Sequence, residues 1–306
     1  MNFRSIFAAS AALLLSSAAA NAAQVAALIG GDTIAMVDTA QKKATGSVKV
    51  TGISGALVGI DVRPADGLLY GLVDDGTIVT IATDGKATTK SKLDTMLAKG
   101  VAATVDFNPV ADRLRVMGAD GMNLRANVDD GKVTKDGDHK YADGDMHKGE
   151  KPNIVAGAYI NSVKGAKETA LFNIDGTIGG LIKQAPPNDG VLAAIGKLGI
   201  KADTVAFDIW SDGAGKNEAW LMADGTLYSI DLATGKATEA AKIAGVHLRA
   251  IANPKLVPAS QSRRCLQRSI ASHDSATSAV FTPSSAKSRM INRAARKTAR
   301  VVPQKS

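Results

Sequence analysis

Residues 59–88 read GIDVRPADGLLYGLVDDGTIVTIATDGKAT, and residues 104–134 read TVDFNPVADRLRVMGADGMNLRANVDDGKVT. Asp61 and Asp106 open the two copies 45 residues apart, and the Asp-Gly pairs inside the copies keep the same offset. Short apolar runs separated by Asp-Gly pairs are typical of strands joined by tight turns. A repeat of this length built from strands and turns is typical of one blade of a β-propeller.

The rest of the chain contains further copies and two incomplete ones. A third copy begins at 154–159 and a fourth at 204–209, whereas residues 25–50 match only the last three strands of a repeat. Residues 246–252 form a single apolar run without later partners. We therefore predict an all-β, five-bladed propeller of four-stranded antiparallel blades. It is closed by pairing the N-terminal strands with the C-terminal strand 246–252, which removes the open sheet edges.

The two ends of the chain differ from the repeated body. Arg4, an apolar run to Leu15 and the small residues around Ala22 are typical of a secretory signal, so residues 1–22 are predicted to be a signal peptide cleaved after Ala22. Residues 23–257 would then be the propeller domain of a periplasmic or secreted protein. No segment is apolar and long enough to predict a transmembrane helix.

Residues 258–306 are rich in Ser and Arg and lack the turn pattern. Ten Lys and Arg and one Asp give this segment a net charge of 10 − 1 = +9, whereas the whole chain has +8. The body is therefore slightly acidic and is not expected to bind nucleic acid. We predict a disordered tail, which is either a basic interaction arm or the product of a shifted reading frame at the end of the gene. The only cysteine, Cys265, lies in this tail, so no disulfide framework or cysteine metal site is expected in the body.

Several motifs of the body are specific enough to indicate a family. From about Ala27 to Pro254 the chain resembles the bacterial domain of unknown function 4394 family. The matching motifs are at residues 59–70, 105–116, 123–125, 158–162, 186–190 and 227–235. The resemblance implies an exported, propeller-like domain and brings no known activity.

Aligning the first strands of the copies places Asp61, Asp106, Tyr159 and Asp208 at equivalent positions, with Ile251 in the shared blade. This strand lines the axis of a propeller. Three acids around one channel are suited to hold Ca²⁺ through oxygen ligands or to bind a polyhydroxylated ligand. The alternative is that each carboxylate accepts backbone N–H bonds in its own blade.

The other candidate ligand-binding residues, Arg63, Asn108, Arg113 and Arg115, are predicted at the same mouth of the axis. Alternation puts Arg113 and Arg115 on one strand face, where two guanidinium groups could clamp a carboxylate or phosphate. The alternative is a salt-bridge network with Asp106 and Asp112. Either interpretation requires acidic partners, because an unpaired buried Arg is very costly.

No known catalytic grouping or phosphate-binding loop is recognisable, and His139 and His147 in the polar loop 136–150 have no third metal ligand placed by the sequence. We favour a non-catalytic, monomeric binding module for a small ligand or a protein, with no cofactor other than Ca²⁺. The alternative is a Ca²⁺-dependent propeller hydrolase or lactonase that uses the axial Asp residues.

Overall fold

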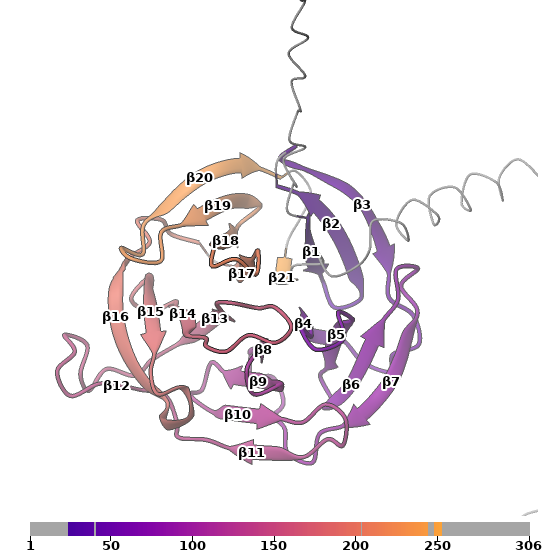
Figure 1. The fold of residues 1–306 in the computed structure, drawn as a ribbon, viewed down its shortest axis with the longest axis horizontal. Helices are drawn as coiled ribbons and strands as arrows, with labels where there is room; N and C mark the ends of the chain where they lie inside the picture. Colours follow the sequence, from indigo (N-terminus) through magenta and orange to yellow (C-terminus); the bar gives the residue numbers. More distant parts are fainter. Residues whose placement is uncertain (1–23, 40, 203, 244–247, 253–306) are drawn as a thin grey trace, which may run out of the picture. The chain divides into compact units, whose positions relative to one another are not determined.

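A computed structural model describes residues 24–39, 41–202, 204–243 and 248–252. These residues form five small sheets arranged as blades around a common axis (Figure 1). The only helical element among them is a single 3₁₀ turn, η1 (Pro187–Asp189). The predicted signal peptide and the predicted tail lie outside the described residues.

The blades follow the repeats of the sequence, each running from an inner strand at the axis to an outer strand at the rim. Blade 1 contains β4 (Leu57–Val62), β5 (Leu69–Val73), β6 (Thr77–Ile81) and β7 (Ala87–Lys92). Blade 2 contains β8 (Ala103–Asn108), β9 (Arg113–Gly118), β10 (Asn123–Ala126) and β11 (Val133–Lys135). Blade 3 contains β13 (Ile154–Tyr159), β14 (Leu171–Asp175), β15 (Gly180–Gln184) and β16 (Val191–Lys197). Blade 4 contains β17 (Val205–Ser211), β18 (Asn217–Ala223), β19 (Thr226–Ile230) and β20 (Ala237–Lys242).

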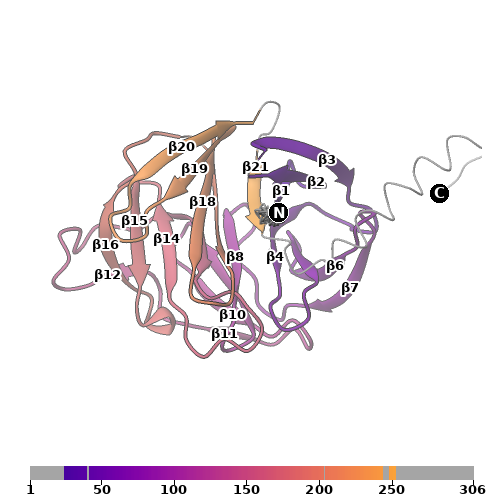
Figure 2. The same cartoon turned by 45° about the horizontal axis from the view of Figure 1, so that its top comes forward.

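Blade 5 is built from both ends of the described chain, as predicted. Its inner strand is β21 (Leu248–Ala252), followed outward by β1 (Gln24–Ile29), β2 (Thr33–Asp38) and β3 (Lys43–Lys49). β21 pairs antiparallel with β1, with Ala252 opposite Ala26 and Ile251 opposite Ala27. Figures 1 and 2 show β21 between the axis and β1, so the ring closes within this blade. The described strand begins at Leu248, two residues after the predicted start.

Blade 3 differs from the prediction by one additional strand. β12 (Lys140–Tyr141) lies within the loop predicted to be irregular and pairs in parallel with the outer strand β16. The chain leaving blade 2 therefore contributes a fifth strand to the rim of blade 3. A two-residue strand is too short to show a hydrophobic period, so no sequence pattern predicts it.

The Asp-Gly pairs form the hairpin turns of the blades. Gly76 and Gly121 have φ values of 86° and 102°, which L-residues with side chains rarely adopt. The preceding aspartates stabilise the same turns, because Asp75 Oδ1 accepts the N–H of Thr77 and Asp120 Oδ1 accepts that of Met122. The Asp-Gly pair therefore recurs along the chain because this hairpin turn recurs.

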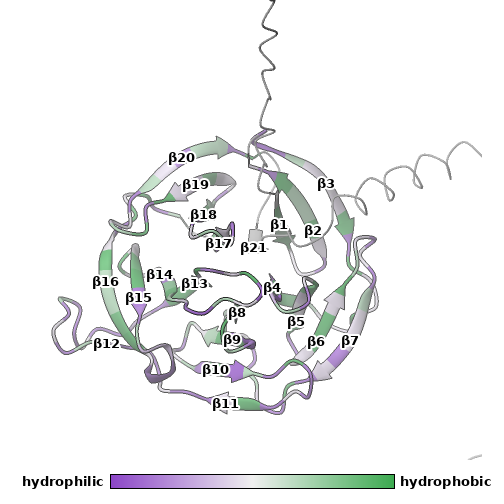
Figure 3. Cartoon of the chain, in the orientation of Figure 1, coloured by the Kyte–Doolittle hydropathy of each residue, from purple (hydrophilic) through white to green (hydrophobic). Residues whose placement is uncertain are grey.

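The apolar core lies between neighbouring blades. One cluster joins Leu28 of blade 5 to Leu57 and Ile60 of blade 1, and another joins Leu72 of blade 1 to Phe107 of blade 2. The outer strand β7 is polar by contrast: it is mostly exposed, and Figure 3 shows a hydrophilic segment on it. Each sheet buries both faces only through its neighbours, so the ring is one cooperative arrangement. In the part of the chain that the structure describes, no helix has the length and apolarity needed to cross a membrane.

Candidate functional site

Three aspartates converge at the axis. Asp61 on β4, Asp106 on β8 and Asp208 on β17 are only 8%, 4% and 6% exposed. One carboxylate oxygen from each lies within 4.8 Å of those of the other two. The alignment of the copies therefore brought together the correct three acids, which we call the axial cluster.

The pairing registers correct the alignment at two other positions. The bulges near the starts of β4 and β13 match Gly59 to Ala156, which puts Ala158 and not Tyr159 at the level of Asp61. The same comparison for β21 puts Ala252 and not Ile251 at this level. Three blades thus contribute a carboxylate at this level and two contribute alanine.

Tyr159 belongs to a different contact. Its side chain is fully buried against Met117 and Tyr141 on the blade 2 side, and its hydroxyl accepts a hydrogen bond of 3.1 Å from Nε of Arg115. Tyr159 therefore joins blades 2 and 3 and does not belong to the axial cluster.

The axial carboxylates accept backbone N–H groups in a regular way. Oδ2 of Asp61 accepts the N–H of Phe107 in the next blade at 2.6 Å, and Oδ1 of Asp106 accepts that of Tyr159 at 3.0 Å. Blades 1 and 4 each follow a blade that has alanine at this level. In these two blades the aspartate of the same blade accepts the corresponding N–H instead. Oδ1 of Asp61 accepts the N–H of Val62, and Oδ1 of Asp208 accepts that of Ile209.

This pattern leaves part of the cluster without donors. Among the described residues, no protein donor contacts Oδ2 of Asp106 or Oδ2 of Asp208. These two aspartates belong to the blades on either side of blade 3, which contributes only Ala158 at this level. The acids converge, and each also accepts a backbone N–H as the second alternative predicted, although Asp61 and Asp106 accept it partly or wholly from the next blade.

The environment favours the neutral form of each acid. Burial raises the pKa of Asp208 to about 7. The pKa values of Asp61 and Asp106 lie well above the usual range, first because of burial and then because of the neighbouring carboxylates. Three buried acids this close together bind positive charge at neutral pH, either protons or a cation.

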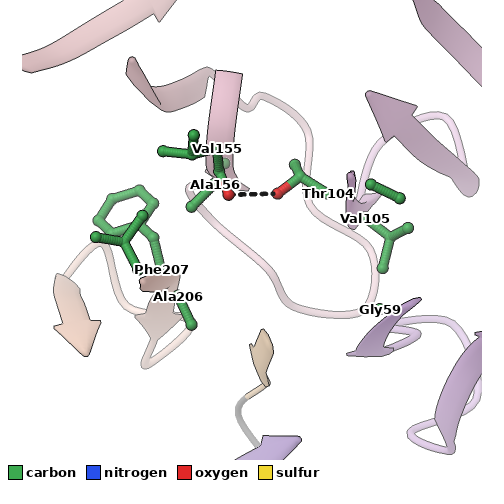
Figure 4. A pocket seen from close by; sticks show the side chains of 10 residues that line it. Gly59, Thr104, Val105, Val155, Ala156, Ala206 and Phe207 are labelled. Atoms are coloured by element: carbon green, nitrogen blue, oxygen red, sulfur yellow. Dashed lines mark hydrogen bonds between the residues drawn. The ribbon is translucent and has the colours of Figure 1, made fainter. Parts of the chain in front are cut away.

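A small cavity lies between the inner strands, two residues along them from the axial cluster, and none of the three aspartates lines it. It has a volume of about 10 Å³, room for a single water. Its lining includes Gly59, Thr104, Ala156 and Ala206, each two residues before the level of the axial cluster on its strand. Figure 4 shows these short side chains around the opening, with the Thr104 hydroxyl donating to the Val155 carbonyl. The cavity fits water or a small ion better than an organic molecule.

Arg63 directly follows β4, and its guanidinium group is hydrogen-bonded to several carboxylates. Its guanidinium forms paired bonds with Asp112 (2.8 and 2.7 Å) and with Asp129 (3.2 and 2.8 Å), and it also contacts Asp66 and the Tyr70 hydroxyl. The pKa of Asp129 falls to about 2, chiefly through its bonds with Arg63 and Lys90. Arg63 thus joins blades 1 and 2.

Arg115 forms a second closed network between blades 2 and 3. It is 1% exposed and donates to Asp136 at 2.6 Å, to Asn123 and Asn188 at 2.8 Å each, and to Tyr159. The predicted partners were therefore wrong: Arg115 pairs with Asp136, whereas Asp112 pairs with Arg63.

The remaining two candidates bind their own turn. Oδ1 of Asn108 accepts the N–H groups of Val110 and Ala111 at 3.0 and 2.9 Å. Arg113 donates to the carbonyls of Ala111 and Asp112. Arg113 and Arg115 consequently have separate partners and do not form the expected clamp.

The role of Asp136 was missed from the sequence, and His139 was considered there only as a metal ligand. Asp136 binds both Arg115 and Arg125. In the sequence it looked like one of many acids in the loop. The only indication of its role was that a buried Arg needs an acidic partner. His139 is 7% exposed, and neither ring nitrogen has a partner among the described residues. Burial, followed by the charge of Arg115, lowers its pKa to about 4.

Comparison with solved structures finds matches of low identity. A protein of unknown function from Bacteroides caccae is 13% identical with a TM-score of 0.38, and the match covers 71% of this chain and 72% of that one. A protein of unknown function from Bacteroides thetaiotaomicron is 15% identical with a TM-score of 0.43, covering 70% and 55%. The computationally designed protein Ika8 is 14% identical with a TM-score of 0.36, covering 72% and 59%.

No curated protein matches the chain. The model of one protein family does match, over residues 33–252, and its description is a domain of unknown function, DUF4394. The match spans most of the chain and every blade described above. This propeller therefore belongs to the domain of unknown function 4394 family.

Proposed function

We propose that this protein is an exported, non-catalytic binding propeller and that its ligand is a cation, Ca²⁺ first of all, held on the axis by Asp61, Asp106 and Asp208. The observation that carries the proposal is the convergence of three acids in which the Oδ2 atoms of Asp106 and Asp208, two residues that are 4% and 6% exposed, have no protein donor among the described residues. A carboxylate removed from water is costly unless positive charge compensates it.

The dimensions of the cluster suit a calcium ion. Ca²⁺ binds oxygen at about 2.3–2.6 Å, so oxygens on opposite sides of the ion are about 5 Å apart. The oxygens of the axial cluster lie within 4.8 Å of one another. Ca²⁺ takes about 6–8 oxygen ligands in flexible geometry, of which the three aspartates would supply a part.

The same geometry favours binding over hydrolysis. A calcium-dependent hydrolase must bring an organic substrate to its ion, but these acids are at most 8% exposed and the cavity between the inner strands has room for one water. Arg63 and Arg115, which would bind an anionic substrate at the mouth, already bind acids of the protein. We therefore assign the cluster a ligand and not a reaction.

The test is equilibrium dialysis of the full-length protein with Ca²⁺ after chelator treatment, together with thermal melts. We expect one bound Ca²⁺ and, at one hundred times the Kd, a stabilisation of about 2.7 kcal/mol. Asp106→Asn keeps the acceptor for Tyr159 but removes one ligand, and it should abolish both effects.

Asp231→Asn is the matched control, because Asp231 also accepts a backbone N–H but lies in an exposed turn of blade 4. It should bind Ca²⁺ like the unaltered protein. No bound metal at millimolar Ca²⁺ would refute the proposal. Binding of Mg²⁺ in place of Ca²⁺ would refute the choice of ion.

A further inference from the structure

We infer that the axial site exchanges its ion through one mouth of the ring, the mouth at which the inner strands begin. The connection between β13 and β14 closes the opposite mouth, at which the inner strands end. The inference rests on the proposed function, because it assigns a route of access to the ion held by the three aspartates. It adds residues that set the rate of ion exchange.

The first step is the position of the cavity between the inner strands. Its lining residues Gly59, Thr104, Ala156 and Ala206 lie near the starts of β4, β8, β13 and β17, two residues before the level of the axial cluster. Two residues along a strand correspond to about 7 Å. The cavity therefore lies between the axial cluster and the end of the ring at which the inner strands begin, which we call the entry mouth.

The second step is the size of the side chains at the entry mouth. Gly59, Ala156 and Ala206 have no atom beyond Cβ. The Thr104 hydroxyl donates to the Val155 carbonyl at 3.4 Å, which holds this side chain at the wall of the cavity (Figure 4). The axis is consequently narrow at this level but is not filled by a side chain of these four residues.

The width of the entry mouth also selects the ion. A cavity of about 10 Å³ has room for a single water, so an ion passes it with few of its own waters. Ca²⁺ accepts a flexible coordination, whereas Mg²⁺ gives up its waters reluctantly. This route therefore favours Ca²⁺ over Mg²⁺ and excludes organic molecules.

The third step is the length of the connection from β13 to β14. It spans residues 160–170, whereas the equivalent connections of blades 1, 2 and 4 span only 63–68, 109–112 and 212–216. Figure 1 shows it extending from blade 3 over the centre of the ring. It therefore lies across the mouth at which the inner strands end, which we call the covered mouth.

This connection is fixed to the inner hairpin of blade 4. The N–H of Asn161 donates to Oδ1 of Asn217 at 2.8 Å, and Nδ2 of Asn217 donates back to Oδ1 of Asn161 at 3.0 Å. The N–H of Ser162 donates to Oγ of Ser211 at 2.9 Å. Asn161 also donates to the carbonyl of Glu168 at 3.1 Å, which joins the two arms of the connection. These bonds hold the connection in place over the covered mouth and leave the entry mouth as the route for the ion.

The test is the rate at which the full-length, Ca²⁺-loaded protein releases its ion to an excess of a fluorescent chelator in a stopped-flow instrument. Thr104→Leu narrows the entry mouth, and each passage then requires displacement of a packed side chain. We expect release to slow about tenfold, the equivalent of about 1.4 kcal/mol in the barrier. The Kd from equilibrium dialysis should be unchanged, because a barrier slows entry and exit equally.

The matched control is Thr104→Val, which keeps the shape of threonine but cannot donate to the Val155 carbonyl. It should release Ca²⁺ at the unaltered rate. Equal slowing in the two variants would overturn the inference, because the lost hydrogen bond and not the width of the mouth would then control release. Thermal melts in EDTA report whether Thr104→Leu folds; if it does not, Ala156→Val narrows the same mouth from the neighbouring strand.

A shortened connection tests the covered mouth. Replacement of residues 163–167 by two glycines keeps the bonds of Asn161 and Ser162 to blade 4 and removes the part of the connection beyond them. Combined with Thr104→Leu, it should restore release at least to the unaltered rate, because it opens a second route to the axis. Release that stays slow in the combined variant would show that the connection does not close this mouth.

Failure of the inference is distinguishable from failure of the proposed function. If dialysis shows bound Ca²⁺ but Thr104→Leu releases it at the unaltered rate, the inference is wrong and the proposed function stands. A weaker Kd without slower release also overturns the inference, because Thr104 would then act on the site itself. If dialysis shows no bound metal, the proposed function fails and the inference fails with it.

Discussion

Two groups of buried charges hold this propeller together, and they are arranged in opposite ways. Around Arg63 and Arg115, opposite charges meet and the guanidinium groups are surrounded by acceptors. At the axis, like charges meet and two carboxylate oxygens lack donors among the described residues. The comparison teaches that burial of charge alone does not identify a site; the balance between donors and acceptors does. The following changes test that distinction.

Removal of Arg115 should have the largest effect. Arg115→Met keeps much of the volume but leaves Asp136, with a side chain 4% exposed, to the partly exposed Arg125 alone. Breaking a buried pair costs about 3–5 kcal/mol, and we expect that loss in urea-induced unfolding.

The control for Arg115 is Arg113→Met on the same strand, because Arg113 binds only two carbonyls of its own turn. Its loss should be about 1 kcal/mol. Equal losses for the two variants would contradict the proposed difference between a network and a turn contact.

His139 should make the protein sensitive to acid. Its pKa in the folded protein is about 4, below the ordinary value of 6.5, so the folded state excludes a proton that the unfolded chain accepts. Its destabilising contribution is absent above pH 6.5 and grows as the pH falls toward 4. The shift corresponds to about 3 kcal/mol at most.

The measurement is the free energy of unfolding between pH 7 and pH 4 for the unaltered protein and for His139→Leu. The difference between the two removes the contribution of all other titrating groups, and it should change in favour of the variant as the pH falls. A constant difference across this range would mean that His139 is accessible to protons in the folded state.

The axial cluster should respond with the opposite sign to the arginine networks. In EDTA, Asp106→Asn removes a buried acid whose pKa is raised by burial and by the neighbouring carboxylates, and it keeps the bond with the N–H of Tyr159. The folded protein holds a proton that the unfolded chain releases near neutral pH, so we expect the variant to have the higher free energy of unfolding at pH 8. A loss of stability would place Asp106 with the structural acids.

An exposed ion pair should contribute least to the free energy of unfolding. Lys92 and Asp75 are 2.9 Å apart, with side chains 62% and 40% exposed. Lys92→Ala should change the free energy of unfolding by about 0–1 kcal/mol, because water and salt screen such pairs. A loss comparable to that of Arg115→Met would show that distance and not burial determines the effect.

The sequence was sufficient for the architecture because the turns repeat. Asp75-Gly76 and Asp120-Gly121 mark equivalent hairpins, and the orphan strand ending at Ala252 matched the strand missing at the N-terminus. The three axial acids could also be predicted, since Asp61 and Asp106 open the two clearest copies.

The exact registers could not be predicted. Aligning the first strands by sequence alone placed Tyr159 among the acids, but the pairing registers of β4 and β13 put Ala158, one residue earlier, at that level. A shift of one residue moves a side chain to the other face of its sheet. The partners of Arg63 and Arg115 depend on contacts between residues from 21 to 73 positions apart, which no local pattern encodes.

The sharing of blade 5 has a consequence for how the fold can be written as a chain. Because β21 and β1 are antiparallel neighbours, the polypeptide is a circle interrupted inside one sheet, between its first and second strands. A circularly permuted gene that connects β21 to β1 by a short hairpin and begins instead between β5 and β6 would encode the same ring. The interruption of the chain would then move from blade 5 to blade 1.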